Sequence, residues 1–172
     1  MGDYTGKSSL EQFAEILISH GVEFIVVGGQ AEILLGSSRP TYDVDLCYRR
    51  TKENLRRLAG ALSEIKPTLR NAPPNLPFVI DEQSLALGGN FTFDTSIGAL
   101  DLLAYMEPVG TFEEIASRVS TVRVGELELK VIHIDDLITI KRHIQRPKDR
   151  DSLMHLLAIK KVLSERESDP EE

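Results

Sequence analysis

The chain has 172 residues, of which 41% are hydrophobic and 27% charged, proportions that are ordinary for a globular protein. Its length favours one domain with a substantial core, and no apolar run approaches the roughly 20 residues that span a bilayer. A formal net charge of −7 excludes a general electrostatic attraction to nucleic acid. The first residues lack the basic and apolar regions of a secretory signal, and a single cysteine excludes an internal disulfide. We therefore expect a cytoplasmic protein without a membrane-spanning segment.

The amino-terminal part predicts a helix, a buried strand and a second, shorter helix. An apolar stripe at helical spacing predicts the first helix up to His20, with Ser9 as its N-cap. Residues 22–27 are a continuous apolar run rich in β-branched side chains, which predicts a strand buried on both faces. The short helix predicted at residues 31–35 follows a pair of glycines. The unpaired N–H groups at the start of this helix would point to the space over the glycines, where they could bind a phosphate group.

Two aspartates follow on an alternating segment. Residues 42–48 alternate between polar and apolar side chains, which predicts a strand. Asp43 and Asp45 are two residues apart, so we expect them to share a face, roughly 7 Å apart at Cα. Two carboxylates beside a glycine turn suit a divalent cation that carries a phosphate chain. Each feature alone is weak, since such a pair is most often a solvated polar face.

The rest of the chain continues a mixed α/β pattern. Further helices are predicted over residues 52–65, 82–87, 111–117 and 134–145 and after Pro147, with Thr51, Asp81 and Asp135 as N-caps. Hairpins are predicted from residues 91–95 with 99–105 and from 121–124 with 127–132, and residues 66–77, which hold four prolines, are predicted to be a loop. We expect one domain, with a core over residues 1–133, a helical pair over 134–166 packed on it, and a frayed acidic tail over 167–172, the loss of order beginning near Ser164.

Asp101 is a charge inside a predicted strand that is otherwise apolar on both faces. A charge buried there is costly unless it is paired or binds a metal. From the residues alone, a salt bridge to an arginine such as Arg39 and ligation of a metal both remain open. Asp94, on the neighbouring predicted strand, is the alternative candidate for a third carboxylate beside the first two.

Taken together, these residues resemble the signature of the nucleotidyltransferase superfamily that includes DNA polymerase β. In that signature an apolar residue precedes two small residues, and a spacer leads to an Asp-apolar-Asp-apolar strand. Residues 27–29 (Val-Gly-Gly) and 43–46 (Asp-Val-Asp-Leu) match it, and residues 39–41 match the Arg-x-Thr of small bacterial members. Residues 98–103 are similar to the strand that carries the third carboxylate of those members. The segment 136–153 is similar to the ending of toxin- and abortive-infection-type members.

The resemblance implies a mixed α/β nucleotidyltransferase fold with a C-terminal helical pair. It also implies transfer of a nucleoside monophosphate from an NTP, such as ATP, to an acceptor hydroxyl on a protein, an RNA end or a small molecule. Asp43, Asp45 and Asp101 would be the catalytic residues and would hold two Mg²⁺ ions, or Mn²⁺ in their place. By the same carry-over the nucleotide-binding residues are Gly28, Gly29, Gln30, Arg39, Thr41 and Lys141.

The resemblance also implies that Arg146, Lys148 and Asp149 fix the corner between the last two helices. From the residues alone, Asp149 and Asp151 are explained by N-capping and by charge at the start of the last helix, and we favour that interpretation.

Several features keep other functions open. Gln30 stands where many members carry a small hydroxyl residue, which weakens the expectation of tight triphosphate binding. One alternative is a non-catalytic module of the same fold that binds an NTP or a small helical partner protein, as in a toxin–antitoxin pair. Another is a structural protein that keeps the aspartates as a polar face. The presence of all three carboxylates favours an enzyme, but the sequence identifies neither the acceptor nor the nucleobase of the NTP.

Overall fold

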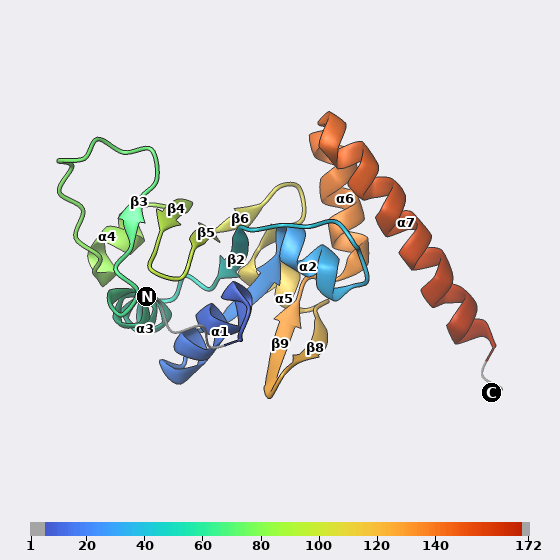
Figure 1. The fold of residues 1–172 in the computed structure, drawn as a ribbon, viewed down its shortest axis with the longest axis horizontal. Coiled ribbons are helices and arrows are strands. Elements are labelled where there is room, and N and C mark those ends of the chain that lie inside the picture. The colour runs from blue at the N-terminus through green and yellow to red at the C-terminus, as the bar shows by residue number, and fades with distance from the viewer. Residues whose placement is uncertain (1–5, 170–172) are drawn as a thin grey trace.

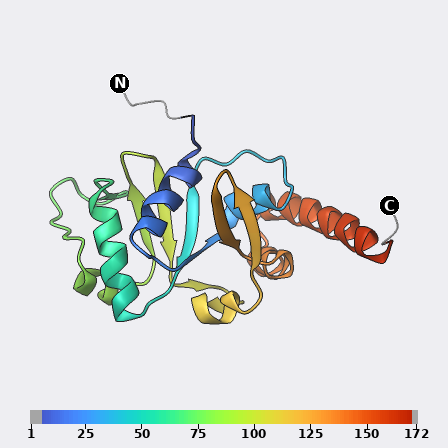
Figure 2. The same cartoon turned by 90° about the horizontal axis from the view of Figure 1, so that it is seen from below.

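The structure is a computed structural model that describes residues 6–169 (Figures 1 and 2). The helices are α1 (Ser9–Ser19), α2 (Gly28–Leu34), α3 (Lys52–Ser63), α4 (Glu82–Leu87), α5 (Phe112–Ala116), α6 (Ile134–Ile144) and α7 (Pro147–Ser168). The strands are β1 (Phe24–Val27), β2 (Val44–Tyr48), β3 (Thr68–Leu69), β4 (Phe91–Asp94), β5 (Ala99–Leu103), β6 (Tyr105–Met106), β7 (Gly110–Thr111), β8 (Ser120–Val124) and β9 (Leu127–Val131). The predicted mixed α/β fold with a C-terminal helical pair is confirmed.

Seven strands form one mixed sheet in the order β3-β4-β5-β2-β1-β9-β8, and β6 pairs with β7 separately. All four residues of β1 are buried, because this apolar strand lies inside the sheet between β2 and β9. β2 runs antiparallel to β1 and parallel to β5. The two registers place Val27 opposite Asp45 and Asp45 opposite Asp101. The glycine turn after β1 and both aspartates therefore meet at one place in the sheet.

The helices cover the sheet unevenly. α1 and α3 lie side by side against one face of the sheet (Figures 1 and 2) and contribute the buried side chains Phe13 and Leu58 to the core. α6 packs on the core and also against α7. α7 leads away from the body of the domain in both views, and its buried residues, Asp149, Ser152 and Leu156, all lie in its first half. Within residues 6–169 no helix is both long enough and apolar enough to cross a membrane.

Local structure departs from the sequence predictions mainly at helix ends. Ser8, not Ser9, caps α1, and its Oγ accepts a hydrogen bond from the Glu11 N–H at 3.2 Å. His133, not Asp135, caps α6, and its Nδ1 accepts from the Asp135 N–H at 3.2 Å. In both cases the cap is the residue with extended backbone just before the first helical turn, a position that periodicity locates only approximately. Thr51 and Asp81 cap their helices as predicted.

Two further segments differ from their prediction. The predicted loop at residues 66–77 contains the short strand β3, which pairs with the outer side of β4 in the register Thr68 to Asp94. α7 continues past Ser164 to Ser168, so the expected loss of order does not begin at Ser164. Residues 170–172 of the predicted acidic tail lie outside the described residues. β3 brings the following residue, Arg70, to within 3.2 Å of Asp101 in the middle of β5.

Asn54 anchors α3 to the ends of β1 and β2. Its side chain is 1% exposed, and its amide donates to the carbonyl oxygens of Glu23 at 3.1 Å and Arg49 at 2.7 Å. Its Oδ1 accepts from the Glu23 N–H at 2.7 Å. The amide thus satisfies the Glu23 N–H and the Arg49 carbonyl oxygen, and it adds a second donor to the Glu23 carbonyl oxygen, which also accepts from the Arg49 N–H at 3.3 Å.

We predict that Asn54→Ala lowers the free energy of unfolding by about 2–3 kcal/mol, because buried backbone groups lose their partners. Urea denaturation would measure the change. Glu53→Ala is the matched control on the same helix, because it removes a solvent-exposed i,i+4 ion pair with Arg57 and should cost less than about 0.5 kcal/mol. Equal losses in the two variants would contradict the anchoring role of Asn54.

Candidate functional site

The glycine turn at the start of α2 is shaped by two close approaches. Gly28 has a φ of +64°, which favours glycine, and a Cβ there would overlap the carboxylate of Asp45. A Cβ at Gly29 would lie 2.9 Å from Oγ1 of Thr41, closer than packed atoms tolerate. α2 begins at the first glycine, earlier than predicted, so both glycines belong to its first turn. Asp45 and Thr41 therefore lie directly against the bare backbone of this turn.

Asp45 and Asp101 form the acidic centre of the site. They face each other across the parallel pair β2–β5. Burial raises the pKa of Asp45 from its ordinary value of 3.8 to about 7, and the charge of Asp101, a hydrogen bond between the two carboxyl groups, and the charge of Asp43 add to this rise. Lys141 opposes the rise only in part. The surroundings of Asp45 therefore neutralise its carboxylate only in part.

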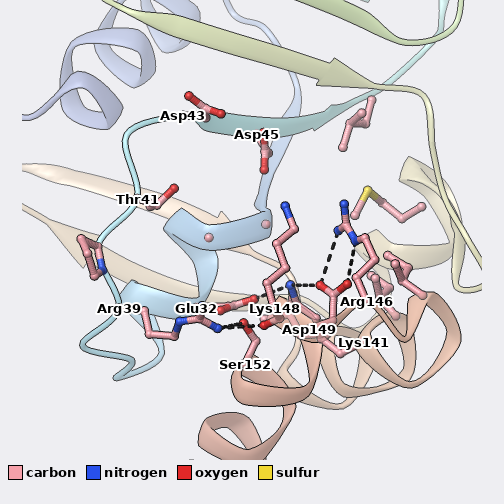
Figure 3. A pocket seen from close by; sticks show the side chains of 18 residues that line it. Glu32, Arg39, Thr41, Asp43, Asp45, Lys141, Arg146, Lys148, Asp149 and Ser152 are labelled. Carbon is pink, nitrogen blue, oxygen red and sulfur yellow. Dashed lines mark hydrogen bonds and ion pairs between the residues drawn. The ribbon is translucent and has the colours of Figure 1, made fainter.

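Asp43 does not share the orientation that the alternating pattern predicted. β2 begins at Val44, so Asp43 lies in the preceding loop and is exposed. In Figure 3, Asp45 points towards the lysines below it, whereas the Asp43 carboxylate lies at the start of the strand and is turned aside. The β1–β2 ladder ends at the pair Val27–Asp45, so no strand partner on that side fixes Asp43. The alternating pattern therefore predicts a strand position correctly for Asp45 but not for Asp43.

Asp101 is paired with an arginine, but the arginine is Arg70 and not Arg39. Arg70 Nη2 lies 3.2 Å from Oδ1 of Asp101, an oxygen that is buried and accepts no hydrogen bond. The same guanidinium contacts Asp94, the alternative third carboxylate, through Nε at 3.1 Å. Arg39 instead donates to the Lys148 carbonyl oxygen at 2.9 Å and to Ser152 Oγ at 2.6 Å, and so ties the motif loop to α7.

A pocket of about 420 Å³ lies between the glycine turn, the start of β2 and the corner of α6 and α7 (Figure 3). Most of the residues that the resemblance assigned to the nucleotide or the metal line it, namely Gly28, Gly29, Arg39, Thr41, Asp43, Asp45 and Lys141. Gln30 and Asp101 are not among its lining residues. Part of the wall is apolar and includes Leu103, Met106, Leu137, Ile140 and Ile144.

Lys141 lies in a buried network of ion pairs on the floor of this pocket. Its Nζ is 2.9 Å from Oε1 of Glu32 and 3.2 Å from Oδ1 of Asp149. Arg146 Nε contacts Oδ2 of Asp149 at 2.7 Å. Burial alone would raise the pKa of Asp149, but hydrogen bonds from Arg146 and Lys141 hold it below its usual range. Two nearly inaccessible carboxylates thus already balance the charge of Lys141.

Asp149 therefore has a role that its position at a helix start did not indicate. Of the favoured interpretation, N-capping is wrong, because Arg146 is the N-cap residue, whereas acidic charge at the start of the helix is confirmed for Asp149, which lies in the first turn of α7. Its 1% exposed carboxylate joins α6 to α7 through Lys141 and Arg146. The corner role implied for these motif residues by the resemblance matches these contacts for Arg146 and Asp149. Lys148 contributes to the corner only its backbone carbonyl oxygen.

The sequence reasoning missed Lys148 and Glu32 as residues of the pocket. Lys148 lines the pocket, and among the described residues its ammonium group makes no ion pair. Its side chain extends across the pocket towards Asp45 (Figure 3). The available signal was the Arg-x-Lys-Asp segment, which places a lysine beside the residue that fixes the corner. For Glu32, the signal was a charge on a short helix next to the buried strand.

The donor set suits a hard cation, although the side chains do not converge on one point. No three His, Cys, Asp or Glu side chains of residues 6–169 are arranged to hold a metal ion. Asp43, Asp45 and Asp101 offer only oxygen donors, which Mg²⁺ prefers. The raised pKa of Asp45, caused by burial and by the charges of Asp101 and Asp43, marks a carboxylate that a cation would stabilise. The chemistry of the site therefore fits a divalent cation, and Asp43 is an exposed residue that lines the same pocket.

The raised pKa of Asp45 predicts a pH dependence of stability. A carboxyl group with a raised pKa stabilises the fold below its unfolded value of 3.8, and this contribution is lost as the pH rises through about 7. We expect the free energy of unfolding of Asp45→Asn to fall less than that of the wild type between those two values. Urea denaturation across this range in EDTA would measure it, with Asp151→Asn as control. Parallel profiles for Asp45→Asn and the wild type would contradict the assignment.

Comparison with known proteins supports the fold. No protein-family model matches the sequence, and no curated protein is similar to it. The structure is similar to the crystal structure of the lincosamide antibiotic adenylyltransferase LnuA with lincomycin bound, with a TM-score of 0.58, 14% identity, and coverage of 88% of this chain and 96% of that one. It also matches an antigenic nucleotidyltransferase-like protein from Paracoccidioides brasiliensis, with a TM-score of 0.47, 13% identity, and coverage of 88% and 76%. The chain therefore has the nucleotidyltransferase fold that its motif residues predicted.

Proposed function

We propose that the protein is a nucleotidyltransferase that moves a nucleoside monophosphate from an NTP to an acceptor hydroxyl. The observation that carries this proposal is the convergence of separate segments on one pocket. The glycine turn, the Asp45 carboxylate and a lysine ammonium that makes no ion pair among the described residues all face the same cavity. Backbone N–H groups and a lysine ammonium group can bind a phosphate chain, and carboxylates can bind the metal ion that accompanies the phosphates.

The phosphates would lie over the turn formed by Gly28 and Gly29, beside the Thr41 hydroxyl. Lys148 is the better candidate for a direct phosphate contact, because its ammonium group extends into the pocket and makes no ion pair among the described residues. Lys141 would act mainly by holding α2, α6 and α7 together, since Glu32 and Asp149 already neutralise it. Arg39 would hold the loop that carries Thr41 in place through its contacts with α7.

Asp43, Asp45 and Asp101 would hold Mg²⁺ or Mn²⁺. A bound cation supplies neutralisation of phosphate charge and lowers the pKa of an acceptor hydroxyl. Asp45 is fixed against Gly28 and beside Asp101, so its carboxylate is oriented before any ligand arrives. Asp101 is the residue we propose to accept the proton of the acceptor hydroxyl, because it lies beside Asp45 at the third-carboxylate position.

The apolar wall of the pocket suits a flat or apolar group, either the nucleobase or part of an acceptor. The volume of about 420 Å³ lies within the range of small-molecule sites, roughly 300–1,000 Å³. The similar adenylyltransferase has a lincosamide antibiotic bound. A small-molecule acceptor is therefore one proposal for this chain, beside a protein hydroxyl and an RNA end.

One observation favours the second candidate, a module that binds an NTP or a partner without transfer. Arg70 contacts Asp101, and the three carboxylates do not converge. A partner such as the small helical subunit of a toxin–antitoxin pair would find exposed apolar side chains on α7, among them Met154 and Val162. The transfer experiment below separates the two candidates.

We predict that the protein, incubated in a cell extract with Mg²⁺ and each α-labelled NTP in turn, transfers label to a protein, RNA or small-molecule fraction. The double variant Asp43→Asn, Asp45→Asn should lose at least about 100-fold of this transfer, because both proposed metal ligands are removed. Asp151→Asn on α7 is the matched control and should transfer normally. Retained binding of NTP without transfer of any of the four labels would favour the binding module.

We also predict that replacing the two pocket lysines has different effects, one on NTP binding and the other on the stability of the fold. Lys148→Gln should weaken NTP binding about tenfold, through loss of a charged phosphate contact, with little change in melting temperature. Lys141→Gln should lower the free energy of unfolding by about 3 kcal/mol, because buried Glu32 loses its ion-pair partner and buried Asp149 keeps only Arg146. Calorimetric titration with an NTP and urea denaturation would measure both effects. The opposite pattern would assign the phosphate contact to Lys141.

A further inference from the structure

Arg70 holds a fixed position beside the acidic centre. It follows β3 directly, and its backbone N–H donates to the Thr92 carbonyl oxygen at 2.9 Å. Its guanidinium donates from Nη2 to the Phe93 carbonyl oxygen at 2.9 Å and from Nε to Asp94 Oδ1 at 3.1 Å. Backbone and side chain are thus both tied to β4, and the guanidinium cannot move far without breaking these contacts.

From this position Arg70 reaches the carboxylate that the proposed reaction needs most. Its Nη2 lies 3.2 Å from the buried Asp101 Oδ1, and the contact is electrostatic, since that oxygen accepts no hydrogen bond. Both side chains are shielded, with 24% and 21% of their surfaces exposed. Because Asp101 lies opposite Asp45 in the sheet, the positive charge of Arg70 lies against one of the carboxylates that a cation at this site would use.

We propose that Arg70 is an internal counter-cation that competes with a divalent cation for Asp101, and thereby makes metal binding depend on the phosphates of the nucleotide. This inference rests on the function proposed above. A fixed positive charge reduces the affinity of neighbouring carboxylates for a cation. The negative charge of a triphosphate compensates for Arg70, so the metal binds tightly only together with the NTP.

In this proposal Arg70 tunes the affinity of the site for a cation, whereas a purely structural role would affect only the stability of the fold. If Arg70 only joined β3 to β4, replacing it would change stability and leave the affinity for a cation unaltered. If it competes for Asp101, removing its charge strengthens the binding of a cation even without nucleotide. Arg70→Lys keeps the charge and Arg70→Gln removes it, so this pair of variants separates charge from packing.

The test is a titration of the protein with Mn²⁺ without nucleotide, in which electron paramagnetic resonance measures the free Mn²⁺. We expect Arg70→Gln to bind Mn²⁺ on the order of tenfold more tightly than the wild type, the effect of one charge at close range even in a water-like dielectric. Arg70→Lys should bind as weakly as the wild type. Arg123→Gln is the matched control, because it removes an exposed arginine on the β8–β9 hairpin.

Two additional measurements complete the test. A non-hydrolysable NTP analogue should tighten Mn²⁺ binding in the wild type by a larger factor than in Arg70→Gln. Adding Asp101→Asn to Arg70→Gln should abolish the gain. Circular dichroism checks that each variant folds, and Arg70→Met, which keeps the apolar stem, replaces Arg70→Gln if the latter does not fold.

The outcomes separate this inference from the proposed function. Unchanged or weaker Mn²⁺ binding by Arg70→Gln, with the wild type binding Mn²⁺ in the presence of the analogue, would overturn the inference and leave the proposed function standing. Failure of every variant to bind Mn²⁺, with or without the analogue, would overturn both.

Discussion

The parallel pairing of β2 with β5 is the contact on which the rest of the site depends. It sets Asp45 against Asp101, while the antiparallel pairing of β2 with β1 sets Asp45 against the end of Val27 and the glycine turn. Burial, with the adjacent carboxyl group of Asp101, raises the pKa of Asp45, so ionisation of this group destabilises the native state as the pH approaches neutrality. The sheet therefore maintains a concentration of negative charge that a cation would relieve.

Charge on the opposite side of the pocket is balanced differently. Lys141 and Arg146 are paired with Glu32 and Asp149, and these pairs join α2, α6 and α7. Paired in this way, the buried charges specify how the helical pair meets the core, and removal of Lys141 would leave buried Glu32 without its partner. Lys148, on the same corner, makes no ion pair among the described residues and faces the cavity. One turn of α7 thus supplies both a structural and a ligand-facing charge.

The sequence predicted the order and type of most elements, because helices and strands leave a local period in the apolar residues. It also predicted the glycine turn, Asp45 and Asp101 as members of one site, through their resemblance to a known signature. Helix caps at Ser8 and His133 were missed by one or two residues, because several residues near a helix start can accept the same hydrogen bond.

The amino-acid sequence by itself determined the order and type of most elements through local patterns, and the residues at the glycine turn through their resemblance to a known signature. Only the tertiary structure decided how the charges are paired. Arg70, rather than Arg39, contacts Asp101 because β3 joins the edge of the sheet, and Lys141 is neutralised because α2 and α7 bring carboxylates to it. Ion pairs between residues far apart in the chain leave no period in the sequence, so the choice of partner rests on packing alone.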